Sequence, residues 1–479
     1  MPSIEKREHP GDTFIVLSKD ARRFSKKESY RISIEAGQFL AKTLKSTLGP
    51  TGMDKLLVSS GGSYTVTNDG FTIAGTLDIE HPIGKALVEV AKTQDDEVGD
   101  GTTTAVVMAG EMLGKASQLL EAGFHPNLVI DGYGTAIQAA LETLDTLAAE
   151  VGPEEIPILE KIAATAMTGK YVEAQKQLLA RLCAQASKRV AEVGEEGLHV
   201  SMERIKFVKA LGRMEETELV DGVVIGNERS HPAMPLRVEG AKIALIGNHL
   251  DVQFLQNVSS EIRVSTLEEL WAHTGVEVEI SQRKAELIKA TGANVLLCGG
   301  RVGEDILHRL TRAGIYVVES VIKPDLHKLA RATGGVIVTE VENLRAEDLG
   351  KAGVVRERAV GGERYTFVEG CDGAKAVTLF LRGSANYILD EIERCAVDGV
   401  SVVAAILRDG RYLPGGGATE VELARSIRKR ARSIGTKAQL VMAAFADALE
   451  SIPKALAENS GFDPIEKLLA LRVAHEKGG

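Results

Sequence analysis

The sequence is poor in aromatic residues and in cysteine. Phe, Trp and Tyr make up 4% of the 479 residues, and Trp271 is the only tryptophan. A chain with so few rings must build its cores mainly from Ala, Val, Leu and Ile. The four cysteines are far apart and form no C-x-x-C pair, which argues against a zinc site or a disulfide framework. We therefore expect the chain to fold in a reducing compartment.

Long apolar runs and an excess of positive charge are also missing. No stretch approaches about 18 apolar residues without charge, and the N-terminal segment MPSIEKREHPGD is charged where a signal peptide needs an apolar run. The sequence thus predicts a cytoplasmic protein with no membrane partner. The net charge of −10 argues against a nucleic-acid partner, and the basic run RSIRKRAR at 425–432 is typical of the solvated face of a helix.

The common nucleotide and hydrolase signatures are absent as well. The chain carries no Walker A motif, no H-E-x-x-H and no G-x-S-x-G. Its length predicts roughly three domains. From about residue 216, strands alternate with helices, which predicts an α/β domain between mostly helical segments. The expected strands are 242–246, 294–297, 315–318 and 336–338, and the expected helices are 304–312 and 325–332.

The stretch TQDDEVGDGTTTAVVMAGEML at 93–113 runs from an acidic turn into a predicted helix. Thr102, Thr103 and Thr104 fall in the first helical turn, where backbone N–H groups lack partners and the helix dipole favours an anion. Asp100 stands between two glycines beside this predicted phosphate site. A carboxylate facing phosphates requires a cation between them, and Mg²⁺ is the natural candidate. An Asp or Thr N-cap on an ordinary helix is the alternative interpretation.

Two other glycine-rich breaks are candidates for contact with the same ligand. Gly49 and Pro50 end a helix predicted from about Ser29. The segment PGGGATE at 414–420 opens another helix and offers a second glycine-rich backbone surface at a helix start. For the break at Gly49 and Pro50, an ordinary helix stop is the alternative interpretation.

Three charged residues outside these breaks are further candidates. Asp69 belongs to an Asn-Asp-Gly hairpin signal and is expected either to help activate water or only to form the turn. Lys170 lies in a Thr-Gly-Lys loop, where it either reaches a terminal phosphate or is an exposed lysine. Asp398 lies close to the apolar side of a helix predicted over 385–404. It is either a surface residue or a poorly solvated carboxylate that needs a compensating cation or donor.

One segment within the α/β part, residues 251–290, carries more apolar side chains than its length needs. The surplus predicts an arm that binds a partner. A surface helical hairpin is an equally good interpretation of the same residues.

Seven motifs together resemble those of the group II chaperonins, the family of the archaeal thermosome and the eukaryotic cytosolic chaperonin. They occur in the family's order and spacing and span nearly the whole chain. Family members continue past Gly479, so the chain resembles a C-terminally shortened subunit. The motifs are TLGPTGMDKLLV (47–58), TVTNDG (65–70), TQDDEVGDGTTTAVVMAGE (93–111), TAMTGK (165–170), LRGSANYILDEIERCAVDG (381–399), PGGGATEVELA (414–424) and AFADALESIPKALAENSGFDPIE (444–466).

The resemblance implies an ATP hydrolase that uses Mg²⁺. It implies that Asp100 holds the metal and that Asp69 and Asp398 position the attacking water. It also implies a loop, Gly169 with Lys170, that senses the γ-phosphate of ATP. The remaining nucleotide contacts that it implies are Gly49, Pro50, Gly101, Thr102, Thr103, Thr104 and Gly416.

The fold implied by the resemblance is a multidomain α+β chain. It consists of a mostly helical equatorial ATP domain (1–145 and 404–479), a small intermediate hinge domain (146–215 and 365–403) and an α/β apical domain (216–364) with a helical lid insertion at about 251–290. The implied partners are non-native polypeptide clients and other chaperonin subunits in a double ring, with ATP hydrolysis driving lid closure. The alternative is a degenerate chaperonin-like protein that binds unfolded chains without ring assembly or ATP turnover.

Overall fold

A computed structural model describes residues 26–58, 61–62, 64–170, 172–194, 197–251, 267–371 and 376–477. The chain divides into two compact units. Unit 1 comprises Met1–Glu97, Gly101–Ala148 and Leu413–Gly479, and unit 2 comprises Val98–Asp100 and Ala149–Tyr412. The expected multidomain α+β fold is confirmed, and the finer division into five segments stays a prediction.

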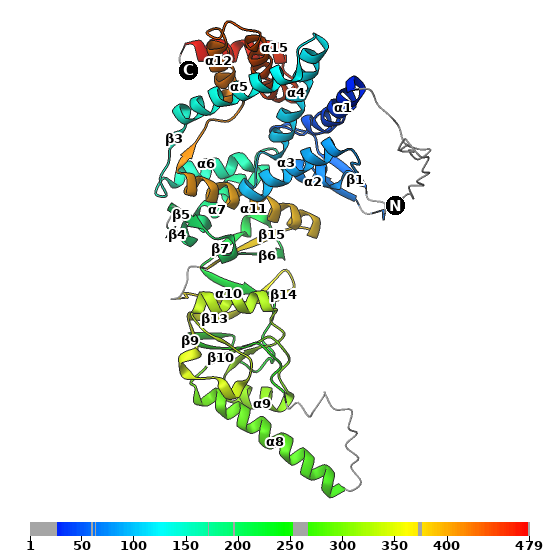
Figure 1. Cartoon of the computed structure of the whole chain (residues 1–479). Helices are drawn as coiled ribbons and strands as arrows, with labels where there is room; N and C mark the ends of the chain where they lie inside the picture. The colour runs from blue at the N-terminus through cyan, green and yellow to red at the C-terminus, as the bar shows by residue number, and fades with distance from the viewer. Residues whose placement is uncertain are drawn as a thin grey trace, which may run out of the picture. The chain divides into compact units, whose positions relative to one another are not determined.

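Unit 1 is mostly helical (Figure 1). Leu40 and Leu44, one turn apart on α1, are buried in one core with Val106 and Val107 of α4, and a second core joins α5, α12 and α13. The elements of the unit are α1 (Lys26–Lys45), β1 (Lys55–Val58), β2 (Tyr64–Thr67), α2 (Gly70–Thr76), α3 (Pro82–Val98), α4 (Thr102–Glu121), α5 (Pro126–Leu147), α12 (Ala418–Ala431), α13 (Ala438–Leu449), α14 (Ser451–Asn459) and α15 (Pro464–Glu476).

A buried carboxylate joins the C-terminal helices of unit 1. Glu450, between α13 and α14, is 1% exposed and receives hydrogen bonds from Arg428 of α12 and Arg472 of α15. Burial by itself raises the pKa of Glu450, but the two guanidinium groups outweigh it and lower the pKa to about 2. The basic run at 425–432 is therefore only partly a solvated face, because Arg428 turns inward to this carboxylate.

Unit 2 contains two larger sheets and their covering helices. The three-stranded sheet has the order β6-β15-β7 and packs with α6, α7 and α11 around one core. The helices and strands of the unit are β3 (Ala149–Glu150), α6 (Ile156–Ala166), α7 (Lys176–Val190), β4 (Ala191–Gly194), β5 (Gly197–Val200), β6 (Ile205–Leu211), β7 (Glu218–Val220), β8 (Gly222–Ile225), β9 (Arg237–Ile246), α8 (Leu267–Ala290), β10 (Val295–Cys298), α9 (Glu304–Arg312), β11 (Tyr316–Val318), α10 (Lys323–Thr333), β12 (Ile337–Val338), β13 (Gly350–Val360), β14 (Glu363–Glu369), β15 (Val377–Gly383), α11 (Asn386–Asp409) and β16 (Arg411–Tyr412).

The seven-stranded sheet contains the strands that the sequence predicts. Its order is β11-β10-β9-β13-β14-β8, with β12 also paired to β9, and β9, β10, β11 and β12 run parallel. Successive residues of β9 face opposite cores: Ala244 packs with α8 and α9, and Ile243 packs with α10. Burial on both faces explains the continuous apolar strands. In the predicted arm, α8 is present, whereas 252–266 lie outside the described residues.

The hairpin turn predicted at Asn68-Asp69-Gly70 is wrong. The hairpin pairs β1 with β2, with Leu56 opposite Val66, and ends before Asn68. Asp69 instead caps α2, because its Oδ2 accepts a hydrogen bond from the Thr72 backbone N–H at 2.7 Å. An Asp-Gly pair is compatible with a helix start as well as with a turn. Here the first N–H groups of α2 need acceptors, and the Asp69 carboxylate supplies one, so the pair starts a helix.

The four cysteines, Cys183, Cys298, Cys371 and Cys395, form no disulfide bond with one another. Within the ranges that the structure describes, no helix is both long enough and apolar enough to cross a membrane.

Candidate nucleotide site

The predicted site residues fall in both units, and each group is described within its own unit. In unit 1, α4 begins at Thr102 after Gly101, which has the left-handed φ of 80° and leaves the helix without a side-chain cap. The alternative interpretation, an Asp or Thr N-cap, is therefore wrong. The backbone N–H groups and hydroxyls of the first turn, Thr102–Thr104, lie at the N-terminal end of α4, which favours an anion.

The start of α2 lies against this turn. A Cβ atom on Gly70 would be 2.5 Å from Thr103 Oγ1 and 2.7 Å from Thr103 N, so only glycine permits the approach. Asp69, the residue before Gly70, is thereby held next to the first turn of α4. The structure thus brings together two stretches that the sequence places about thirty residues apart.

Helix α14 packs against the other two glycine-rich breaks, at Gly49 and at Gly416–Gly417. A Cβ atom on Gly49 would be 2.5 Å from Leu456 Cδ2, and one on Gly417, next to Gly416, would be 2.6 Å from Pro453 Cβ. Asn459 Nδ2 donates hydrogen bonds to the carbonyl oxygens of Lys45 and Leu48 at 2.9 and 2.8 Å, which fixes the chain just before Gly49 and Pro50. Asn459 could not be predicted from the sequence, because an Asn near a helix end carries no signal for so distant a partner.

In unit 2, Lys170 and Asp398 form an ion pair. Their side chains are 13% and 11% exposed, so the exposed lysine and the surface aspartate considered as alternatives are both wrong. The prediction that a poorly solvated Asp398 needs a compensating cation or donor is confirmed, and Lys170 is that cation. The loop turns at Gly169, whose φ of 81° favours glycine.

The electrostatics of this pair also involve Asp100. Burial alone lowers the pKa of Lys170, but Asp398 raises it, with further contributions from Cys395 and Asp100, and the net shift is upward. The ammonium group therefore stays charged at neutral pH. Asp100 belongs to the same unit and lies close enough to act on Lys170.

Two buried thiols lie beside the ion pair. Burial raises the pKa of Cys183 above its usual range and that of Cys395 to about 12, so both stay protonated and poorly nucleophilic. Cys183 Sγ contacts the Ala396 carbonyl oxygen at 3.5 Å. The surroundings of Asp398 are thus weakly polar on this side, and a carboxylate without Lys170 would be costly there.

Gly99 sets the position of Asp100 relative to α11. Gly99 has φ of 74°, and a Cβ atom there would be 2.5 Å from Ser401 Cβ and 3.8 Å from Asp398 Cα. The backbone before Asp100 therefore packs directly on the helix that carries Asp398.

We expect Gly99→Ala to lower the turnover number for ATP at least about tenfold, because backbone strain and the clash with Ser401 displace Asp100. Phosphate release under saturating Mg-ATP measures the effect. The double variant Gly99→Ala/Ser401→Gly should recover part of the loss, since it removes the clash and keeps the strain. Unchanged turnover in Gly99→Ala would contradict the placement of Asp100.

The donor set fits nucleotide-bound Mg²⁺ rather than a protein-only metal site. Among the described residues, no group of three or more His, Cys, Asp or Glu side chains could hold a metal ion. Mg²⁺ usually takes one or two carboxylates together with substrate phosphates and water. Asp100, followed at once by the uncapped start of α4, offers that combination.

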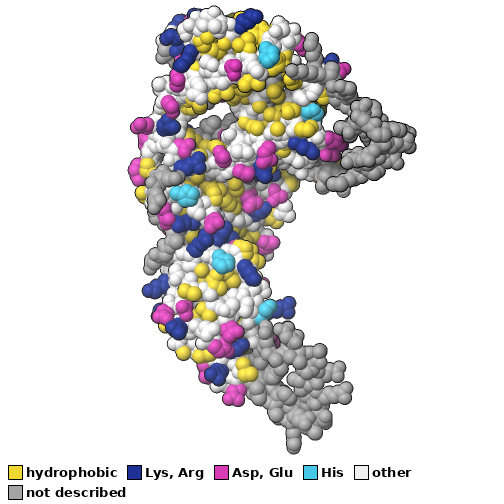
Figure 2. Space-filling model, viewed as in Figure 1, with side chains coloured by type: hydrophobic (Ala, Val, Ile, Leu, Met, Phe, Trp, Pro, Cys, Tyr) yellow, Lys and Arg dark blue, Asp and Glu magenta, His cyan; other side chains and the backbone are white. Residues whose placement is uncertain are grey.

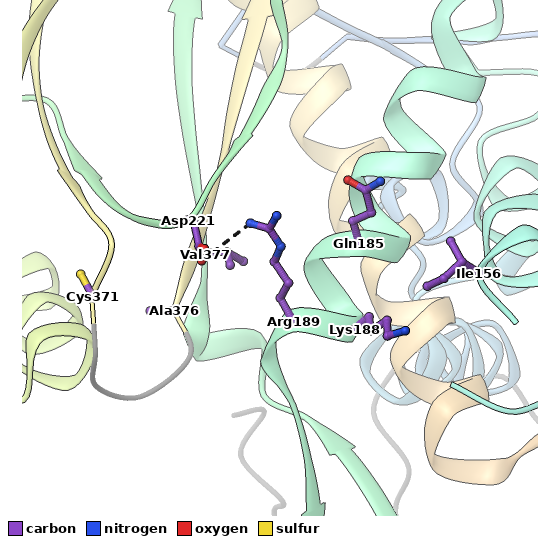
Figure 3. A pocket seen from close by; sticks show the side chains of 8 residues that line it. All are labelled: Ile156, Gln185, Lys188, Arg189, Asp221, Cys371, Ala376 and Val377. Atoms are coloured by element: carbon purple, nitrogen blue, oxygen red, sulfur yellow. Dashed lines mark ion pairs between the residues drawn. The ribbon is translucent and has the colours of Figure 1, made fainter. Parts of the chain in front are cut away.

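A cavity of about 670 Å³ in unit 2 contains none of the predicted site residues. Figure 3 shows Arg189 of α7 directed at Asp221, with which it forms an ion pair at 3.7 Å. Cys371 and Val377 also line the cavity, and Asp221 links β7 of one sheet to β8 of the other. The predicted chemistry does not use it.

Comparison with known proteins identifies similar chains. The model of the TCP-1/cpn60 chaperonin family matches residues 40–479. A thermosome subunit of Methanopyrus kandleri is 47% identical over 469 residues, which are 98% of this chain and 86% of the relative. Thermosome subunits of Pyrococcus horikoshii and Methanocaldococcus jannaschii are 45% and 46% identical over 98% of this chain and over 85% and 86% of their own lengths.

Proposed function

Because the chain belongs to the TCP-1/cpn60 chaperonin family and is a group II chaperonin subunit, we propose that its ATPase activity depends on the residues placed above in both units. The chain is an ATP-dependent molecular chaperone subunit and a chaperonin ATPase. The single observation that supports the residue roles best is the buried Lys170–Asp398 pair with Asp100 close by.

Each residue has a proposed part in phosphoryl transfer, which depends mostly on positioning and charge neutralisation. Gly101 and Thr102–Thr104 bind phosphate oxygens with backbone N–H groups and hydroxyls. Asp100 holds Mg²⁺, which neutralises phosphate charge. Gly49, Pro50 and Gly416 contact the nucleotide through closely approaching backbone.

The proposed switch is an exchange of partners by Lys170. Without nucleotide, Lys170 neutralises Asp398. The γ-phosphate of ATP competes for the ammonium group of Lys170, which is held by the loop after Gly169. Asp398, released from Lys170, then accepts a hydrogen bond from the attacking water, and Asp69 orients the same water.

The proposed domains follow the family: equatorial 1–145 and 404–479, intermediate 146–215 and 365–403, and apical 216–364 with a lid at about 251–290. We propose that hydrolysis drives closure of this lid over non-native polypeptide clients in the cytoplasm. We propose no nucleic-acid or membrane partner.

Unit 1 has apolar surface for the proposed double ring of subunits. Leu56 lies opposite Val66 and Val58 opposite Tyr64 in the β1–β2 hairpin, and all four side chains are exposed. Figure 2 shows further hydrophobic side chains on the visible surface of this unit. An exposed apolar hairpin is a ready surface for pairing with another chain.

The test is to measure the solution mass of the purified chain by light scattering with and without Mg-ATP, with phosphate release followed in the same samples. We expect a particle many times the 51.2 kDa of one chain, together with turnover. A monomer or small oligomer without turnover would contradict the proposed function.

A further inference from the structure

The loop that carries Lys170 is held from both sides by one acidic residue, Glu173. On one side, the Gly169 backbone N–H donates a hydrogen bond to Glu173 Oε2 at 3.1 Å. On the other side, the Glu173 backbone N–H donates to the Lys170 carbonyl oxygen at 3.1 Å. Glu173 thus closes a short turn around Lys170.

Glu173 is itself fixed by the first residue of α7. Lys176 Nζ forms an ion pair with Glu173 Oε1 and lies 3.5 Å from Thr168 Oγ1. The hydrogen bonds from Lys176 and from the Gly169 N–H lower the pKa of Glu173, so the carboxylate is charged at neutral pH. Three residues of the loop, Thr168, Gly169 and Lys170, are therefore tied to the start of α7.

The side chain of Lys170 is not part of these contacts with Glu173 and Lys176, and it pairs with Asp398. The position of its ammonium group depends on the backbone at Gly169, because the left-handed conformation there directs the chain of the next residue. A lysine has a flexible four-carbon stem, so a mobile backbone would leave the ammonium group poorly placed.

We propose that Glu173 is a positioning residue for the nucleotide-sensing loop: it holds the Gly169–Lys170 backbone so that Lys170 distinguishes ATP from ADP. This inference rests on the proposed contact between Lys170 and the γ-phosphate. Glu173 acts through the backbone hydrogen bond to Gly169, and its 53% exposed carboxylate binds the Lys176 ammonium group and the Gly169 N–H.

The test compares the Kd of a non-hydrolysable Mg-ATP analogue with the Kd of Mg-ADP by calorimetry on the full chain. For Glu173→Ala we expect the analogue to bind about fivefold more weakly, the worth of one hydrogen bond, with the Kd of ADP unchanged within about twofold. Glu173→Gln should recover most of the discrimination, because its amide oxygen still accepts from the Gly169 N–H. A general loss of structure would weaken both ligands alike.

Two further variants separate the possible outcomes. Glu154→Ala, which removes the ion pair with Lys188 at the other end of α7, should leave both Kd values unchanged. Lys170→Met should lose the discrimination between the analogue and ADP. If Lys170→Met loses it and Glu173→Ala keeps it, this inference alone is wrong. If Lys170→Met also keeps it, the γ-phosphate contact fails and the inference fails with it.

Discussion

Asp398→Asn should lower the turnover number for ATP at least about a hundredfold, without weakening the affinity for Mg-ATP. An asparagine keeps the shape of the side chain, but its neutral amide is a much weaker proton acceptor for the attacking water than a carboxylate. The phosphate and metal contacts of the nucleotide come from other residues, so binding should persist. Phosphate release and nucleotide titration measure the two quantities.

The matched control for this prediction is Asp390→Asn. Asp390 lies on the same helix, α11, and its carboxylate also pairs with a lysine, Lys209, at 2.8 Å, but it is exposed. We expect its turnover number to stay within about twofold of the unmodified chain. An Asp398→Asn or Asp398→Ala variant that turns over ATP at the unmodified rate would refute the role assigned to Asp398.

Glu450→Gln is expected to destabilise unit 1 by about 3 to 5 kcal/mol. The change removes the buried carboxylate that Arg428 and Arg472 share at the junction of four helices, α12 to α15. Arg428 then keeps only its ion pair with Asp447. Urea unfolding of the full chain measures the loss. Glu142→Gln, which removes a surface ion pair with Arg430 in the same unit, should cost less than about 1 kcal/mol. If the two variants lose the same free energy of unfolding, the buried carboxylate stabilises unit 1 no more than a surface ion pair does.

The same carboxylate predicts how stability depends on pH. The pKa of Glu450 is about 2 in the folded chain against the ordinary value of 4.5. Its contribution, about 3 kcal/mol, is therefore fully present above pH 4.5 and is lost as pH falls from 4.5 towards 2. The stability difference between the unmodified chain and Glu450→Gln should shrink over this range. Parallel stability curves for the two proteins would contradict the lowered pKa.

Local sequence determined the start of α4 and the four parallel strands of the larger sheet. The run Gly-Asp-Gly-Thr-Thr-Thr predicts an anion-binding helix start from backbone properties that neighbouring residues alone decide, and α4 begins at Thr102. Apolar spacing likewise places Asp398 near the buried side of its helix. The same local rules failed at Asp69, because an Asp-Gly pair satisfies a turn and a helix cap equally well.

The tertiary structure decided which distant groups meet. The sequence predicts that Asp398 needs a compensating cation or donor but does not say which one, and Lys170 lies 228 positions away in the chain. Glu450 is separated by 22 positions from each of its two arginines. Helix α14 packs against both Gly49 and Gly417, which lie toward opposite ends of the sequence. Turns and helix ends follow from hydrogen bonds between neighbours, whereas the pairing of buried charges depends on how whole helices pack. Sequence alone therefore predicted candidate residues for the site, and only the packed chain determined their partners.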